Sequence, residues 1–236
     1  MRLDRFLSDM GVASRTQTKK AVREGSVTVN GTVARKSDAQ IDPTKDTVVF
    51  EGERIQYQEY TYVMLNKPKG YISATDDKSK KTVLDLLSPR LCARELFPCG
   101  RLDIDTTGLL ILTNDGKLAH ALLSPKHHAD KVYRFVTDKR LPDDAPEKVR
   151  EGLVLDDGYE CLSAFLELDD VGCGGKITLH EGKFHQIKRM AHTLGSEIVE
   201  LERIEFAGVA LDSSLERGQY RELTEAEVSM LEKHRA

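Results

Sequence analysis

The chain has 236 residues, with 39 acidic and 35 basic side chains and a formal net charge of −4. Apolar residues make up 39% and charged residues 31%, which is typical of a globular chain and excludes a wholly disordered one. No apolar run approaches the ~18 residues of a membrane-spanning helix. Asp4 and Asp9 lie where a signal peptide has its apolar core, so we expect a cytoplasmic protein with no membrane partner.

Residues 1–60 are predicted to form a small domain. Leu3, Phe6 and Leu7 recur at helical spacing, and Ser14 is a suitable N-cap for a second helix over residues 15–24. Residues 27–36 alternate like a strand around an Asn-Gly pair, which is typical of a tight hairpin turn, and a short strand is expected over residues 47–50.

Basic side chains gather in this first domain. Residues 1–36 carry eight basic and three acidic side chains, a charge of +5. Arg15, Lys19 and Arg23 follow one another at four-residue spacing and form one stripe on the predicted second helix, with Lys20 beside them. From the residues alone, this stripe is either a solvated helix face or a surface that contacts RNA phosphates.

The order of these segments carries a resemblance. The runs RLDRFL, SRTQTKKAVREG and VTVNG resemble the alpha-L RNA-binding motif of a ribosomal small-subunit protein and of several RNA-modifying enzymes. The resemblance implies that Arg15, Lys19, Lys20 and Arg23 bind RNA phosphates.

Residues 61–236 mix strands and helices and are predicted to form a second domain. We expect strands over residues 61–67, 108–114, 130–137 and 175–180, a short helix over 82–87 and a longer helix over 184–195. Because consecutive strands lack crossover helices, the predicted fold class is α+β, with a mainly antiparallel mixed sheet flanked by helices and loops.

The acidic side chains of this second part are concentrated in one segment. Residues 138–170 hold eleven acidic and four basic side chains, a charge of −7. The segment accounts for the negative average of a chain whose first residues are basic. We therefore expect two surfaces of opposite charge, with a nucleic acid on the basic one.

The four cysteines form no C-x-x-C pair, and the seven histidines form no H-E-x-x-H motif. The sequence therefore predicts neither a metal site nor a disulfide framework.

Candidate chemistry lies in the run GRLDIDTTGLLILTNDG, residues 100–116. Asp103 and Asp105 stand in a loop directly before an apolar strand, which can hold a side chain rigidly in a cleft. On the residues alone, the two aspartates equally suit turn caps. An acid–nucleophile pair of a glycosidase is a third interpretation, but a spacing of two residues gives it poor geometry.

The same run closely resembles the signature of the pseudouridine synthases that act on ribosomal RNA. Three further runs agree with that family in order and spacing, namely MLNKPKGY, SPKHHADKVY and EGKFHQIKRM. Two details favour the small-subunit synthase A branch: the His127-His128 pair, and lysine at position 188 where many relatives have arginine.

The resemblance implies a reaction and its residues. Asp103 matches the catalytic aspartate, Tyr133 the tyrosine that stacks on the target uracil, and Lys188 the cation that partners the aspartate. No cofactor is implied, because the isomerisation neither gains nor loses atoms.

The implied partner is ribosomal RNA, most specifically 16S rRNA or an assembly intermediate of the small subunit, bound by a monomer. By their place in the motifs, five further cations are expected to contact RNA: Lys67, Lys69, Arg101, Lys183 and Arg189. Two alternatives stay open: an enzyme acting on large-subunit rRNA, and a non-catalytic RNA-binding protein of ribosome assembly.

Overall fold

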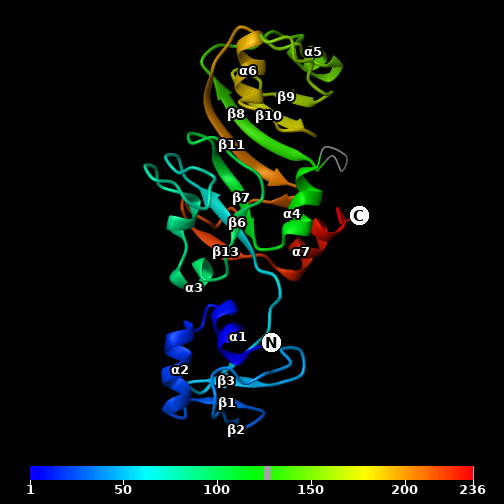
Figure 1. Cartoon of the computed structure of the whole chain (residues 1–236). Coiled ribbons are helices and arrows are strands. Elements are labelled where there is room, and N and C mark those ends of the chain that lie inside the picture. The colour runs from blue at the N-terminus through cyan, green and yellow to red at the C-terminus, as the bar shows by residue number, and fades with distance from the viewer. Residues whose placement is uncertain (125–128, 236) are drawn as a thin grey trace. The chain divides into compact units, whose positions relative to one another are not determined.

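The computed structural model describes residues 1–124 and 129–235, which fold into two compact units (Figure 1). The first comprises Met1–Thr61 and Leu87–Leu96, and the second comprises Tyr62–Leu86 and the described residues from Phe97 onward. His127 and His128 lie outside the described residues. None of the described helices combines the length and apolar character that crossing a membrane requires.

The first unit contains the predicted helices and hairpin. Helix α1 (Leu3–Asp9) and helix α2 (Arg15–Arg23) accompany an antiparallel sheet of strands in the order β2-β1-β3-β4. These strands are β1 (Val27–Val29), β2 (Thr32–Val33), β3 (Val48–Phe50) and β4 (Glu53–Ile55). Ser14 caps α2 through a capping box with Gln17. The buried side chains of Phe6 and Leu7 pack with Val27 and Val48 in its core.

A later segment also belongs to this unit. Helix α3 (Pro89–Cys92) lies in residues 87–96, which sequence reasoning assigned to the second domain. Arg94 explains the packing, because its buried guanidinium donates to Thr61 Oγ1 at 2.8 Å and to the carbonyl of Gln58 at 2.6 Å. A buried guanidinium needs such acceptors, and this unit supplies them.

The second unit is built on one mixed sheet, so the α+β prediction is confirmed. Its strand order is β13-β5-β7-β11-β8-β10-β9, with β6 pairing β7 and β12 pairing β11. The strands are β5 (Tyr62–Lys67), β6 (Phe97–Pro98), β7 (Thr107–Thr113), β8 (Lys131–Thr137), β9 (Phe165–Leu168), β10 (Gly174–Leu179), β11 (Ile198–Phe206), β12 (Val209–Ala210) and β13 (Tyr220–Glu222). The pairing is antiparallel except between β7 and β11.

Helices lie at both ends of this sheet (Figure 1). The 3₁₀ helix η1 (Val83–Leu86) takes the place of the short helix predicted over residues 82–87. Helices α5 (Ala145–Glu151) and α6 (Gln186–Thr193) lie with β9 and β11 respectively, whereas α4 (Gly116–Leu123) packs with α7 (Glu225–Glu232). The predicted helix over 184–195 begins only at Gln186, because His185 adopts the left-handed conformation with φ of 47°.

The parallel contact between β7 and β11, called the seam below, joins two halves of the sheet. Only Glu202 with Thr107 and Arg203 with Gly108 are paired there in register. The backbones approach so closely that a Cβ on Gly108, which has a φ of 98°, would lie 2.2 Å from the carbonyl oxygen of Arg203. Buried Arg203 donates from Nε to the carbonyl of Leu109 at 2.8 Å. The seam therefore depends on one glycine and one buried arginine.

Candidate active site

The loop over residues 100–106, between β6 and β7, carries Asp103 at the seam. Its backbone is held by Lys67 at the end of β5, which is fully buried. The Lys67 amino group donates to the carbonyl oxygens of Thr106 at 2.9 Å, Asp103 at 3.0 Å, Pro68 at 3.2 Å and Ile104 at 3.4 Å. Lys67 is thus the internal anchor of the loop.

Burial has two consequences for Lys67. It lowers the pKa of the amino group to about 8, even though the nearby charges of Asp105 and Asp103 act in the opposite direction. It also keeps the side chain away from any bound polymer. The predicted RNA contact of Lys67 is therefore wrong, because a fully buried amine with four carbonyl partners is not available to a phosphate.

Lys188 reaches the loop from the other half of the sheet. It lies in α6, and its Nζ is 3.3 Å from Asp103 Oδ2. The same Nζ donates to both carboxylate oxygens of Asp105, at 2.6 Å and 2.8 Å. His185, just before α6, places Nε2 3.6 Å from Asp103 Oδ1. The structure thus brings Asp103 and Lys188 together, and it adds Asp105 and His185 to the group.

The charges of this group support one another. Burial alone would raise the pKa of Asp105, but the hydrogen bond and the positive charge of Lys188 outweigh it and lower that pKa. Burial would likewise lower the pKa of Lys188, but the hydrogen bond that Lys188 donates to Asp105, together with the charges of both aspartates, raises it instead. Lys188 therefore stays protonated at neutral pH and serves two carboxyl groups at once.

A pocket opens between this loop and α6. Tyr133 of β8, 8% exposed, lines it together with Asp103 and Lys188. Four apolar side chains also line it, namely Leu102, Leu179, Ile187 and Leu201. A pocket with a tyrosine ring, an apolar wall and a carboxylate paired to an ammonium suits a planar, polar ring attached to a sugar.

The predicted RNA-binding cations are distributed unevenly. In the first unit, Arg15, Lys19, Lys20 and Arg23 are all exposed on α2. In the second unit, Arg101 and Lys183 are exposed and line the same pocket as Asp103, whereas exposed Lys69 lines a different pocket.

Arg189 of α6 is already paired within the protein. Its guanidinium binds Asp156 Oδ1 at 2.7 Å and also Asp157. Both acids belong to the 138–170 segment, where a bridge between Val154 and Glu160 turns them toward α6. The expected separation of basic and acidic surfaces is therefore wrong at this point, because one acidic turn lies directly on the helix that carries Lys188.

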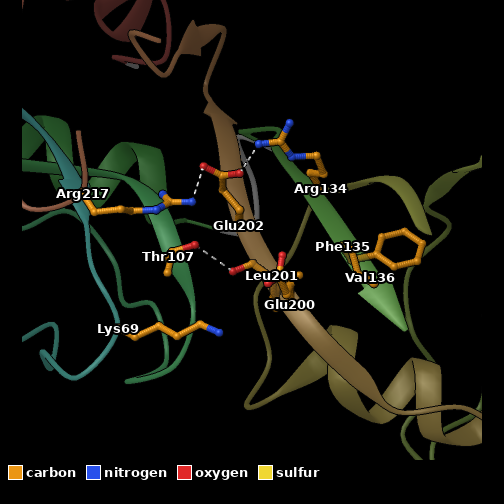
Figure 2. Close-up of a pocket in the computed structure, with 9 residues that line it drawn as sticks. All are labelled: Lys69, Thr107, Arg134, Phe135, Val136, Glu200, Leu201, Glu202 and Arg217. Atoms are coloured by element: carbon orange, nitrogen blue, oxygen red, sulfur yellow. Dashed lines mark hydrogen bonds and ion pairs between the residues drawn. The ribbon is translucent and has the colours of Figure 1, made fainter. Parts of the chain in front are cut away.

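The opposite face of the seam holds an ion-pair bridge (Figure 2). Successive residues of β8 point to opposite faces, so Arg134 points away from the pocket that Tyr133 lines. Glu202 of β11 binds Arg134 on one side and Arg217 on the other, the latter at 2.7 Å. Arg217 also donates to Asn66 Oδ1 of β5 at 2.6 Å. Glu202 thus links the two halves of the sheet behind the pocket.

Sequence reasoning missed His185, the anchoring role of Lys67 and the Glu202 bridge. His185 stands three residues before Lys188, which places the two on one face of a helix, so this spacing was a usable signal. Lys67 and Glu202 gave no such signal, because their roles arise from contacts between distant segments.

Comparisons with known proteins agree with this geometry. A family model described as RNA pseudouridylate synthase matches residues 61–193, and one described as S4 domain matches residues 1–48. An uncharacterized RNA pseudouridine synthase of Bacillus subtilis is 41% identical over 100% of both chains. Ribosomal small subunit pseudouridine synthase A of Haemophilus influenzae is 39% identical, covering 99% of this chain and 100% of its own.

Ribosomal small subunit pseudouridine synthase A of Escherichia coli is 38% identical over 97% of this chain and 99% of its own length. A crystal structure of a pseudouridylate synthase matches with a TM-score of 0.69 and 37% identity, covering 98% of this chain and 99% of that one. The similarity therefore extends over both units.

Proposed function

The chain belongs to the RNA pseudouridylate synthase family, and we propose that it converts a uridine of 16S ribosomal RNA to pseudouridine with Asp103 as the catalytic carboxylate. The observation that carries the proposal is the single pocket in which Asp103, Lys188 and Tyr133 meet. The choice of small-subunit RNA is supported by the full-length relatives that carry the name ribosomal small subunit pseudouridine synthase A.

The reaction exchanges one bond for another. The bond from ribose C1′ to uracil N1 breaks, the uracil turns within the pocket, and C5 forms a bond to the same C1′. The proton on C5 is then lost and N1 gains one, so atoms and electrons balance. A carboxylate suits this chemistry either as a nucleophile toward sugar or base, or as a group that stabilises charge and moves the proton.

Lys188 and Tyr133 support Asp103 in different ways. The ammonium at 3.3 Å stabilises the carboxylate and directs it toward the pocket. Because lysine is a point charge rather than a planar fork, Asp105 can share it without displacing Asp103. The Tyr133 ring lies where a uracil can stack on it, and its hydroxyl is suited to helping move the C5 proton.

The target uridine must leave its stack to reach Asp103. Flipping a base out costs a few kcal/mol, and less where the RNA is already irregular. We therefore propose a single-stranded or distorted target, held by phosphate contacts from α2 in the first unit and from Lys69, Arg101 and Lys183 in the second. We also propose that the protein acts as a monomer, and that it acts in the cytoplasm on its rRNA substrate.

The deciding experiment maps pseudouridines in rRNA from cells with and without this protein. We expect one 16S site to disappear with the protein and to return when the wild-type chain is supplied. Tritium release from uracil-labelled 16S rRNA, naked and in partly assembled particles, then measures the purified protein. Asp103→Asn should abolish release while retaining RNA binding, because the amide has nearly the shape of the carboxylate but not its reactivity.

Each alternative has its own outcome. Loss of a pseudouridine from large-subunit rRNA instead would replace the 16S assignment. Release by Asp103→Asn at the wild-type rate would overturn the role of the aspartate. An unchanged pseudouridine map with retained rRNA binding would favour the non-catalytic alternative.

A further inference from the structure

Phe184 is an exposed aromatic residue beside the active-site pocket. Its residue exposure is 76%, although a phenylalanine ring usually gains by burial. The ring lies flat on the imidazole of His185, with centroids 3.8 Å apart and planes 18° apart. Phe184 and His185 together therefore present an exposed aromatic surface, called the aromatic step below.

The aromatic step is fixed relative to the catalytic carboxylate. His185 lines the pocket, and its Nε2 lies 3.6 Å from Asp103 Oδ1. The backbone at His185 is left-handed, which is unfavourable for a non-glycine residue, and α6 begins directly afterwards. Backbone strain of this kind is retained where the surrounding structure needs the resulting geometry.

Exposed Lys183 and Arg101 supply positive charge near the aromatic step. Lys183 precedes Phe184, is exposed, and has its amino group 4.8 Å from the centre of the Tyr159 ring. Arg101 and Lys188 line the same pocket. An exposed ring flanked by cations fits a ligand with flat apolar faces and negative charge, which is the chemistry of a single-stranded nucleic acid.

We propose that the aromatic step is a stacking site for an unpaired nucleobase next to the target uridine. The inference rests on the proposed function and extends it. When the target base leaves the stack, its neighbour loses a stacking partner, and the ring of Phe184 replaces that partner at the mouth of the pocket. The residue thus acts in binding the flipped-out state, outside the bond exchange itself.

The test measures binding and turnover separately in the full-length protein. Binding of the rRNA fragment around the mapped uridine is titrated with Asp103→Asn protein, in which no turnover occurs. Phe184→Ala and Phe184→Leu should each weaken binding about 5- to 150-fold, the range of one base–aromatic stack. Phe184→Trp should restore it. In wild-type background, the same changes should raise KM and alter kcat less than threefold.

A matched control and an altered RNA sharpen the result. Phe165 of β9 is also exposed, at 58%, but unlike Phe184 it has no chain neighbour that lines the active-site pocket, so Phe165→Ala should leave binding unchanged. An RNA with an abasic nucleotide beside the target uridine should bind weakly to protein that retains Phe184. Phe184→Ala should then cause no further loss of affinity for that RNA.

Wild-type binding by Phe184→Leu would overturn the proposal, since an apolar contact without a ring would then suffice. Additive losses from the abasic RNA and Phe184→Ala would overturn it as well. Phe184-dependent binding without tritium release from any rRNA would contradict the proposed function alone, so the two failures are distinguishable.

Discussion

Lys188 lies closer to Asp105 than to Asp103: its Nζ is 2.6 Å from the carboxylate of Asp105 and 3.3 Å from that of Asp103. Lys188, the cation that partners Asp103, is therefore shared with an acid two residues away. Asp105 keeps Lys188 protonated, because its hydrogen bond and charge raise the pKa of the lysine against the effect of burial.

This sharing predicts how the enzyme responds to alkaline pH. In Asp105→Asn the pKa of Lys188 should fall, because one of the groups that raise it is gone. Lys188 then loses its proton at lower pH, and the alkaline limb of the kcat profile should move to lower pH. Profiles between pH 7 and 10.5 measure this shift. Lys188→Arg is the control, since arginine does not titrate in this range. A shift that persists in Asp105→Asn/Lys188→Arg would contradict the assignment to Lys188 and point to Lys67, whose pKa Asp105 also raises.

A second prediction concerns Lys67. Lys67→Met keeps the apolar stem but leaves the carbonyls of the catalytic loop without their donor. We expect kcat to fall at least about tenfold, because a small displacement of the reacting group is costly. The exposed neighbour Lys69 supplies the control, Lys69→Met, whose kcat should stay close to wild type.

Lys67 also predicts a pH dependence of stability. With a native pKa of about 8 and an unfolded value of about 10.4, the unfolded state binds more protons between these two pH values. The free energy of unfolding of the wild type should therefore rise, relative to Lys67→Met, as the pH increases through this window. Urea denaturation at several pH values measures it, and a difference that stays constant across this window would mean that burial leaves the pKa of the Lys67 amine at its unfolded value.

A third prediction concerns Glu202, which links the two sheet halves behind the pocket. Glu202→Gln removes the charge that binds Arg134 and Arg217 and leaves the two cations facing each other. Because Asp103 stands on one half and Tyr133 on the other, we expect kcat to fall about tenfold, with little change in RNA affinity. Glu200→Gln, on the same strand and pocket, is the matched control. Equal kcat values for the two variants would show that the bridge does not position the site.

A fourth prediction concerns the basic stripe of α2. Deleting residues 1–60 would remove the partners of residues 87–96, so changing the exposed side chains of Arg15, Lys19 and Arg23 to Gln is the cleaner test. The dissociation constant for rRNA should rise. The plot of the logarithm of the association constant against the logarithm of salt concentration should become less steep by about 2, at ~0.7–0.9 per lost phosphate contact. The same change at exposed Lys45 and Arg54 is the control. An unaltered slope in the triple variant would identify the stripe as a solvated helix face.

Local signals in the sequence were sufficient for much of the fold and for the place of Asp103 in a loop directly before an apolar strand. The Asn30-Gly31 hairpin and the Ser14 cap depend on neighbouring residues only, and they form as predicted. The loop of Asp103 is likewise recognisable within one contiguous run. Strand β11 was not predicted, because charged residues such as Glu200, Glu202 and Arg203 interrupt its alternation.

The parts that escaped prediction depend on long-range contacts. Lys67 stands beside a Pro-Lys-Gly turn and therefore resembles a surface lysine, but the loop of Asp103 covers it from 36 residues further along the chain. Arg189 resembles a free cation until the turn with Asp156 closes on it. Neither packing relationship can be derived from spacing along the chain.

The seam also determines when the site can exist during synthesis. Its hydrogen bonds join Thr107 to Leu201 and Leu109 to Arg203, each pair 94 positions apart. Contacts of such separation form late, because a long loop must close first. A nascent chain that has not yet supplied β11 has no strand to hold Asp103 opposite Tyr133. The pocket that Asp103, Tyr133 and Lys188 line is therefore among the last features of this unit to assemble on a growing chain.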